Sequence, residues 1–180
     1  MAYLSGAVAQ FLIGETAVFL AFLLAASAIH KIARWDRTRV AAQDFAGMPA
    51  GASAYGVVAA CTLEALAAAL LMAPSYREIG ARLAVLVLAL YLGLILRAIL
   101  LGRRDVDCGC SFGAPQRMLG AFEIARNAVL LILASLVAVA GNPAAPASLS
   151  DILAAIAFLA LYGALDQVMG LQPMRKGTVL

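Results

Sequence analysis

The sequence predicts an all-α, polytopic membrane helix bundle with about five transmembrane helices. Of its 180 residues, 64% are hydrophobic and 13% are charged, whereas an ordinary soluble domain has about 45–50% and about 25%. The mean hydropathy is +0.96, and the apolar residues form long runs rather than short periodic stripes. These observations exclude a water-soluble globule and place any chemistry in a loop or within the membrane.

Five runs reach the length of about 20 apolar residues that a helix needs to cross the hydrocarbon core. His30 and Lys31 close the first run, Pro74 ends the second, and Ser148 or Ser150 is a cap for the fifth. The predicted spans are residues 7–29, 52–73, 79–101, 118–140 and 149–169.

We predict one transmembrane domain over residues 1–170 and a polar tail over residues 171–180. Residues 1–14 lack the positively charged start of a secretory signal, so the first span is expected to be retained. Between the first two spans, Val40, Ala41, Phe45 and Met48 form an apolar stripe opposite charged residues, which predicts a short interfacial helix.

The basic residues predict the orientation of the chain. Nine Lys and Arg residues lie in the loops and tail on one face, and two lie on the other. Because basic loops are retained in the cytoplasm, this count places the amino terminus outside and the loop after the third span inside. The net charge of +3 is scattered over span ends, so we expect the lipid bilayer as a partner and no nucleic acid.

Two cysteines in that loop, Cys108 and Cys110, are the predicted catalytic pair. They are separated by one glycine within RRDVDCGCSFGAPQR, residues 103–117. A disulfide between them closes a small, strained ring that the glycine makes accessible, and strained, exposed disulfides exchange readily. Neighbouring arginines favour the reactive thiolate, and two aspartates oppose them. The pair predicts thiol–disulfide exchange with a partner protein.

Two other interpretations of the cysteines stay open. The pair can consist of incidental loop cysteines, or it can be half of a metal site. The metal interpretation is incomplete, because the chain adds only His30 and Cys61 to two thiolates. We therefore expect no metal.

Ionisable residues inside the spans predict a polar pocket beneath the cysteines, because such residues are costly in a bilayer and mark functional sites. At about 1.5 Å per residue, those near the ends joined by the cysteine loop lie at similar depths. Glu123 and Arg126, three residues apart, can pair on one helix face. The predicted pocket residues are His30, Arg97, Glu123, Arg126 and Asn127, with Cys61 and Glu64 deeper in the second span.

Such a pocket suits a quinone, whose carbonyl oxygens accept hydrogen bonds from Arg97, Arg126, Asn127 or His30 while its tail lies among the helices. The alternative is that the buried charges only hold helices together. Cys61 is interpreted as a small buried side chain or as a relay thiol. The sequence indicates no partner for Asp166.

Four segments resemble the MauE family of methylamine-utilisation membrane proteins, within the DoxX-like group of small four-helix membrane proteins. They are SAIHKIARWDR, Pro49 with the Glu64-bearing span that follows, RRDVDCGCSFG and the RNAVLL of Arg126 and Asn127. Ser111 departs from the family pattern, in which CGC is often followed directly by Phe-Gly. The resemblance implies that spans one to four form a DoxX-like core.

The resemblance also implies a function in the bacterial inner membrane. MauE-like proteins are expected to assist disulfide formation in the small (beta) subunit of methylamine dehydrogenase, together with a thioredoxin-like, MauD-like partner. Cys108 and Cys110 would then be the exchanging pair, with Arg126 and Asn127 as the motif of the fourth span. The rival interpretations are a non-catalytic membrane anchor or assembly factor for that partner, and a small-solute transporter.

The implied client is periplasmic, whereas the loop charges place the cysteine loop in the cytoplasm. Three explanations are open. The charge rule fails for this chain, the cysteines dip into the membrane, or electrons cross the membrane with Cys61 as a relay.

Overall fold

The computed structural model describes residues 2–102, 120–140 and 147–170. The loop with Cys108 and Cys110 and the predicted polar tail lie outside these residues. Five of the helices in the described part are long and apolar enough to cross a membrane, which confirms the predicted all-α polytopic bundle. The elements are α1 (Ala2–Ala33), α2 (Trp35–Ala46), α3 (Ala50–Met72), the 3-10 helix η1 (Pro74–Tyr76), α4 (Arg77–Leu100), α5 (Ala121–Ala140) and α6 (Leu149–Gly170).

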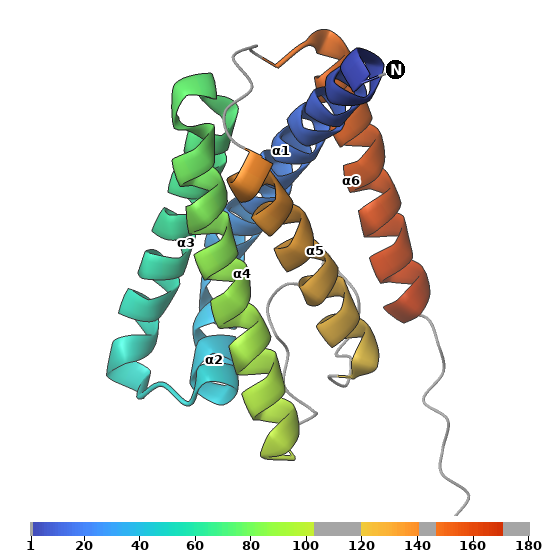
Figure 1. Ribbon diagram of the computed structural model, residues 1–180. Helices are drawn as coiled ribbons and strands as arrows, with labels where there is room; N and C mark the ends of the chain where they lie inside the picture. The colour runs from blue at the N-terminus through green and yellow to red at the C-terminus, as the bar shows by residue number, and fades with distance from the viewer. Residues whose placement is uncertain (1, 103–119, 141–146, 171–180) are drawn as a thin grey trace, which may run out of the picture.

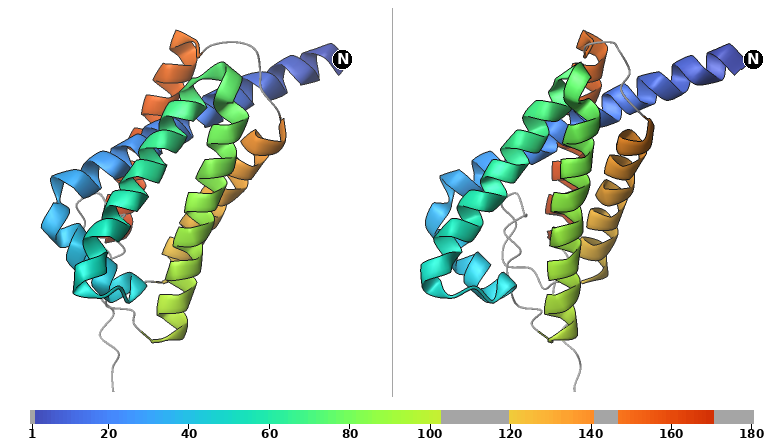
Figure 2. Two further views of the ribbon diagram at one scale, coloured as in Figure 1. Left: turned by 90° about the vertical axis from the view of Figure 1, so that its left-hand side faces the viewer. Right: turned by 60° about the vertical axis from the view of Figure 1, so that its left-hand side comes forward.

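Helix α1 runs obliquely through the bundle and contacts every other long helix (Figures 1 and 2). Helices α3, α4 and α5 pack side by side in chain order, and α6 packs on α1. Helix α4 ends and helix α5 begins at the same end of the bundle, near α2 (Figure 1). We call this the cysteine end, because the segment carrying the two cysteines starts and finishes there.

The predicted short helix between the first two spans is present as α2, but it packs against α3 and α4. It ends at Gly47, whose left-handed φ of 67° suits glycine. Arg97 of α4 donates a hydrogen bond to the carbonyl oxygen of Ala46, 3.0 Å away, and so ties this helix end to the bundle. Val40 of the predicted apolar stripe is 56% exposed, as the apolar face of an interfacial helix can be.

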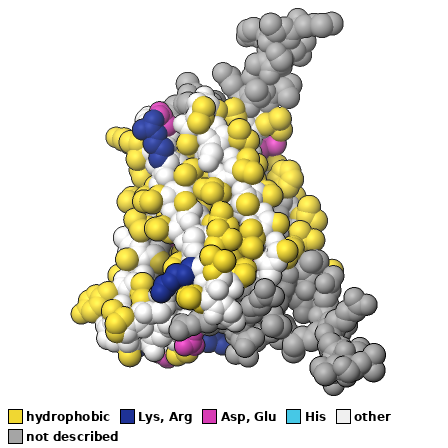
Figure 3. Space-filling model, turned by 60° about the horizontal axis from the view of Figure 1, so that its bottom comes forward, with side chains coloured by type: hydrophobic (Ala, Val, Ile, Leu, Met, Phe, Trp, Pro, Cys, Tyr) yellow, Lys and Arg dark blue, Asp and Glu magenta, His cyan; other side chains and the backbone are white. Residues whose placement is uncertain are grey.

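Small residues and helix caps set the remaining geometry. Gly80 allows α4 to approach α3, since a Cβ atom there would lie 2.6 Å from the backbone nitrogen of Leu71. Ser148 and Asp151 cap α6 reciprocally, each side chain accepting the other's backbone N–H, as one of the two predicted caps requires. Apolar side chains dominate the face shown in Figure 3, as expected for a surface in contact with lipid.

Candidate functional site

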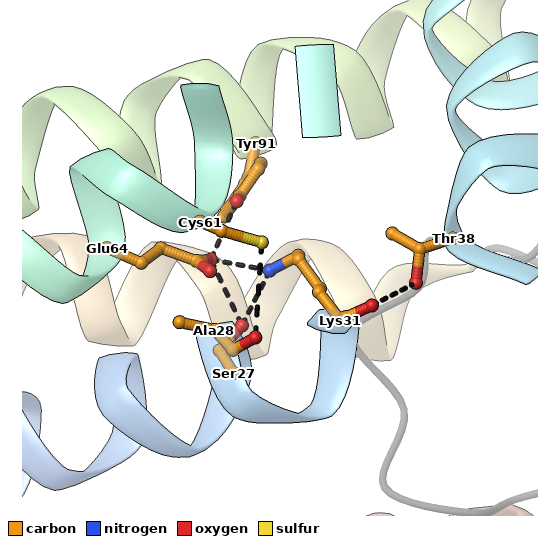
Figure 4. Close-up of polar contacts among 7 residues, drawn as sticks. All are labelled: Ser27, Ala28, Lys31, Thr38, Cys61, Glu64 and Tyr91. Atoms are coloured by element: carbon orange, nitrogen blue, oxygen red, sulfur yellow. Dashed lines mark hydrogen bonds and ion pairs between the residues drawn. The ribbon is translucent and has the colours of Figure 1, made fainter. Parts of the chain in front are cut away.

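A buried carboxylate, Glu64 of α3, is the centre of the best-defined polar cluster in the described part of the chain (Figure 4). Its Oε1 atom accepts from Lys31 Nζ at 2.5 Å, Tyr91 OH at 2.6 Å and Ser27 Oγ at 3.0 Å. Lys31 Nζ also donates to Ser27 Oγ at 2.6 Å and lies 5.0 Å from the centre of the Tyr91 ring. Ser27, Lys31, Glu64 and Tyr91 form what we call the Glu64 cluster.

Three helices contribute to this cluster. Ser27 and Lys31 lie one turn apart on α1, and Tyr91 projects from α4. Lys31 is 5% exposed and Glu64 is 0% exposed, although Lys31 stands only two residues before the end of α1. Glu64 lies about 21 Å along α3 at 1.5 Å per residue. The Lys31 side chain therefore reaches into the bundle, whereas the sequence suggested that Lys31 closes a span at the membrane surface.

The second carboxylate oxygen of Glu64, Oε2, is buried and has no hydrogen-bond partner in the described structure. Glu64 also lines a cavity of about 40 Å³, which we call the inner cavity, together with Tyr91, Arg126 and Asn127. A buried water needs a space of about 10–15 Å³ and polar partners. The inner cavity is thus large enough to hold water next to the Glu64 side chain.

Arg126 of α5 forms a second buried ion pair, with Asp166 of α6. Their Nη1 and Oδ1 atoms are 2.7 Å apart. The guanidinium carbon lies 6.0 Å from the Phe122 ring centre and 5.7 Å from that of Tyr162, within the range of cation–π contacts. This pair gives Asp166 the partner that the sequence did not indicate.

Two further predicted residues anchor α5. Asn127 Nδ2 donates to the carbonyl oxygen of Leu88 at 2.8 Å, which joins α5 to α4. Glu123 Oε2 accepts from the backbone N–H of Gly120 at 2.8 Å, at the start of the helix. The Asn127 bond holds the start of α5 against α4, and the Glu123 bond is a local cap of the helix.

Cys61 lies one turn before Glu64 on α3 and is the free cysteine within the described residues. Its side chain is buried, and its Sγ atom lies 3.9 Å from the carbonyl oxygen of Ala28 (Figure 4). This location beside the Glu64 cluster is compatible with both predicted roles of Cys61, a small packed side chain and a relay thiol.

The structure brings together some of the predicted pocket residues and separates others. Glu64, Arg126 and Asn127 line the inner cavity. Arg97 does not line it, because its exposed side chain contacts the end of α2. His30 is partly exposed and is also not among the residues that line the cavity. The cysteine pair itself lies outside the described residues.

Sequence reasoning missed Ser27 and Tyr91, the pairing role of Lys31 and the partner of Asp166. Ser27 and Lys31 have the four-residue spacing of one helix face, which was an available signal. Nothing in the spacing pairs Lys31 with Glu64 or Arg126 with Asp166, since these contacts depend on how distant helices are rotated against each other.

Comparison with protein families matches the model described as "Methylamine utilisation protein MauE" over residues 8–140, from α1 through α5. The chain belongs to the MauE family. This MauE protein is therefore a multi-pass membrane protein involved in methylamine utilisation. The matched region contains the whole Glu64 cluster, whereas Asp166 and the rest of α6 lie beyond it. Comparisons with curated proteins and with solved structures gave no match.

Proposed function

We propose that this MauE protein is a thiol–disulfide redox protein of the bacterial inner membrane. It assists disulfide formation in the small subunit of methylamine dehydrogenase, together with a thioredoxin-like partner. The observation that carries the proposal is the position of the polar groups. The helices that flank the Cys108–Cys110 segment, α4 and α5, supply Tyr91, Arg126 and Asn127 to the inner cavity.

The chemistry is a two-electron exchange. A thiolate of the thioredoxin-like partner attacks the Cys108–Cys110 disulfide, forming a mixed disulfide and releasing one loop thiolate. The second partner thiolate then attacks the mixed disulfide, so the partner leaves oxidised and the loop cysteines are left as a dithiol. A membrane quinone held near Arg126 would supply the two-electron oxidation that returns the loop dithiol to its disulfide.

The main test replaces each loop cysteine in the full-length protein. Cys108→Ser and Cys110→Ser should each prevent maturation of the dehydrogenase small subunit, because one sulfur cannot complete the exchange. Ser111→Ala, in the same loop, is the matched control and should retain maturation. The measurement is dehydrogenase activity, together with the alkylation state of the loop thiols on gels. Normal maturation in the double cysteine variant would refute the redox function.

A second candidate function is a non-catalytic anchor or assembly factor for the partner. The Glu64 cluster favours it, because a buried ion pair bonded across α1, α3 and α4 serves well to fix a docking surface. This candidate predicts that the redox state of Cys108 and Cys110 never changes in cells and that the partner is still retained by the double cysteine variant.

The side of the membrane on which the cysteines act is tested separately. An impermeant thiol reagent is applied to intact cells and then to lysed spheroplasts. Labelling of Cys108 or Cys110 from outside is expected if the periplasmic client sets the orientation. Labelling only after lysis would agree with the loop charges and require electron transfer across the membrane.

A further inference from the structure

A groove between α5 and α6 has no role in the function proposed so far. It has a volume of about 410 Å³, which lies within the range of about 300–1,000 Å³ typical of small-molecule sites. Three phenylalanines and Tyr162 supply aromatic surface, and Arg126 supplies the charged group. The described lining of the groove is thus largely apolar, and Arg126 and Tyr162 are its residues with hydrogen-bonding side chains.

The groove exists because α5 and α6 pack on α1 but not on each other. No Cα atoms of α5 and α6 lie within 8 Å of each other in the described residues, and both helices contact α1 (Figure 1). The Arg126–Asp166 ion pair and the contact of Arg126 with the Tyr162 ring bridge the gap instead. The long side chain of Arg126 thus links α5 to α6 across the space between them.

A second observation connects the groove to the polar interior. Arg126, Leu130 and Tyr162 line both the groove and the inner cavity, so these side chains form the wall between the two spaces. On the inner side of that wall lies Glu64, which is 0% exposed and whose Oε2 atom has no partner. The guanidinium of Arg126 thus stands between a lipid-accessible groove and a buried carboxylate.

Charge and depth decide which amphiphile fits. The Arg126–Asp166 pair carries no net charge, and the Asp166 carboxylate disfavours an anionic phosphate nearby. Arg126 lies about 7.5 Å into α5 at 1.5 Å per residue, below the level at which phospholipid headgroups sit. A guanidinium has five N–H donors and can serve a carboxylate and a second acceptor at once. The groove therefore suits a neutral head group with carbonyl oxygens and a long apolar tail.

We propose that the α5–α6 groove binds an isoprenoid quinone, with one ring carbonyl accepting a hydrogen bond from Arg126 and the tail lying along Val129 and Leu161. This inference rests on the proposed redox function and gives its electron acceptor a site. In the reaction, two S–H bonds of the loop dithiol break and one S–S bond forms. The two electrons and two protons convert the two quinone carbonyls to hydroxyls.

The test is photolabelling of the full-length protein in phospholipid nanodiscs with an azido derivative of decylubiquinone, mapped by mass spectrometry. Val129→Trp fills the groove from an exposed position, and Ile132→Trp places the same bulk on α5 outside the groove; the two native side chains are 55% and 59% exposed. We expect labelling of α5 and α6 to fall about tenfold in Val129→Trp. It should stay within about twofold of the native value in Ile132→Trp.

A second variant addresses the head group. Arg126→Gln combined with Asp166→Asn removes both charges without leaving one unpaired, and labelling should again fall about tenfold with the loss of a charged donor. Circular dichroism checks that each variant keeps its helices. Three outcomes would each overturn the inference and assign the groove to bilayer lipid. They are equal labelling of the two tryptophan variants, labelling spread over all spans, and displacement of the probe by added phospholipid.

The labelling is repeated in the Cys108→Ser, Cys110→Ser double variant, where no exchange chemistry is possible. Labelling there is expected to equal that of the native protein, because the described residues that line the groove come from α1, α5 and α6. If every cysteine variant still supports maturation, and labelling still falls in Val129→Trp, the redox function is refuted and the binding site remains. If maturation requires both cysteines but Val129→Trp does not reduce labelling, only the quinone site is refuted.

Discussion

The two buried ion pairs of this MauE protein differ in what surrounds them. Lys31–Glu64 joins α1 to α3, helices in direct contact, and the carboxylate accepts two further hydrogen bonds from Ser27 and Tyr91. Arg126–Asp166 joins α5 to α6 across a gap, beside a groove. Both side chains of the first pair are almost fully buried, at 6% and 0% exposed, whereas Arg126 of the second pair forms part of the wall of an open groove.

We interpret the first pair as one that holds the fold together and the second as one that is available to a ligand. Removing one partner of an almost fully buried pair leaves the other charge unpaired, which is strongly destabilising. A pair at a groove can exchange part of its hydrogen bonding with an incoming molecule. We therefore expect the Lys31–Glu64 pair to dominate stability and the Arg126–Asp166 pair to dominate binding.

The largest effect is expected for Glu64→Leu. It leaves the Lys31 ammonium buried without its carboxylate and removes the acceptor of Ser27 and Tyr91. Breaking a buried pair in this way costs about 3–5 kcal/mol. The free energy of unfolding in mixed detergent–SDS micelles, followed by circular dichroism, measures this loss.

The matched control is the double variant Lys31→Met, Glu64→Leu, which removes both charges. Replacing a whole buried pair by apolar residues is often neutral or stabilising, so most of the loss should be recovered. If the double variant is as unstable as the two single losses added together, the two side chains are not coupled and the cluster does not hold the helices as described.

The spans themselves could be predicted from the sequence, because a bilayer requires long apolar runs regardless of tertiary contacts. Glu64 and Arg126 could be singled out for the same reason, since ionisable residues in such runs are costly. Their partners could not be predicted. Local spacing suggested Glu123 for Arg126, whereas the structure pairs Arg126 with Asp166 from another helix.

Lys31 and Arg97 show why positions near span ends are difficult to interpret. Both stand near helix ends in the sequence, yet Lys31 is buried in the bundle and Arg97 is exposed at α2. Their depth depends on where α1 stops and on how α2 packs against α3 and α4, and no periodicity within one helix records these features.

An intermediate effect is expected for Asp166→Leu. The substitution leaves Arg126 without its carboxylate, but that side chain keeps the Phe122 and Tyr162 rings and borders the groove. The loss of unfolding free energy should be about 1–3 kcal/mol, less than for Glu64→Leu. The same unfolding assay measures it, with Asp166→Asn as the control that retains an oxygen acceptor. A loss as large as that of Glu64→Leu would remove the distinction between the two pairs.

The smallest effect is expected for Cys61→Ala, at the edge of the Glu64 cluster. The buried thiol is a small, largely apolar side chain whose 3.9 Å contact with the Ala28 carbonyl oxygen is a weak hydrogen bond. Losing it should cost about 1 kcal/mol or less.

If Cys61 only packs, maturation of the dehydrogenase proceeds normally in this variant while Cys108→Ser prevents it. If Cys61 relays electrons, maturation stops although the unfolding free energy falls by no more than about 1 kcal/mol, because no other described thiol lies within the spans. Measuring both quantities on the same preparation therefore decides whether the enclosed region of the bundle takes part in the chemistry.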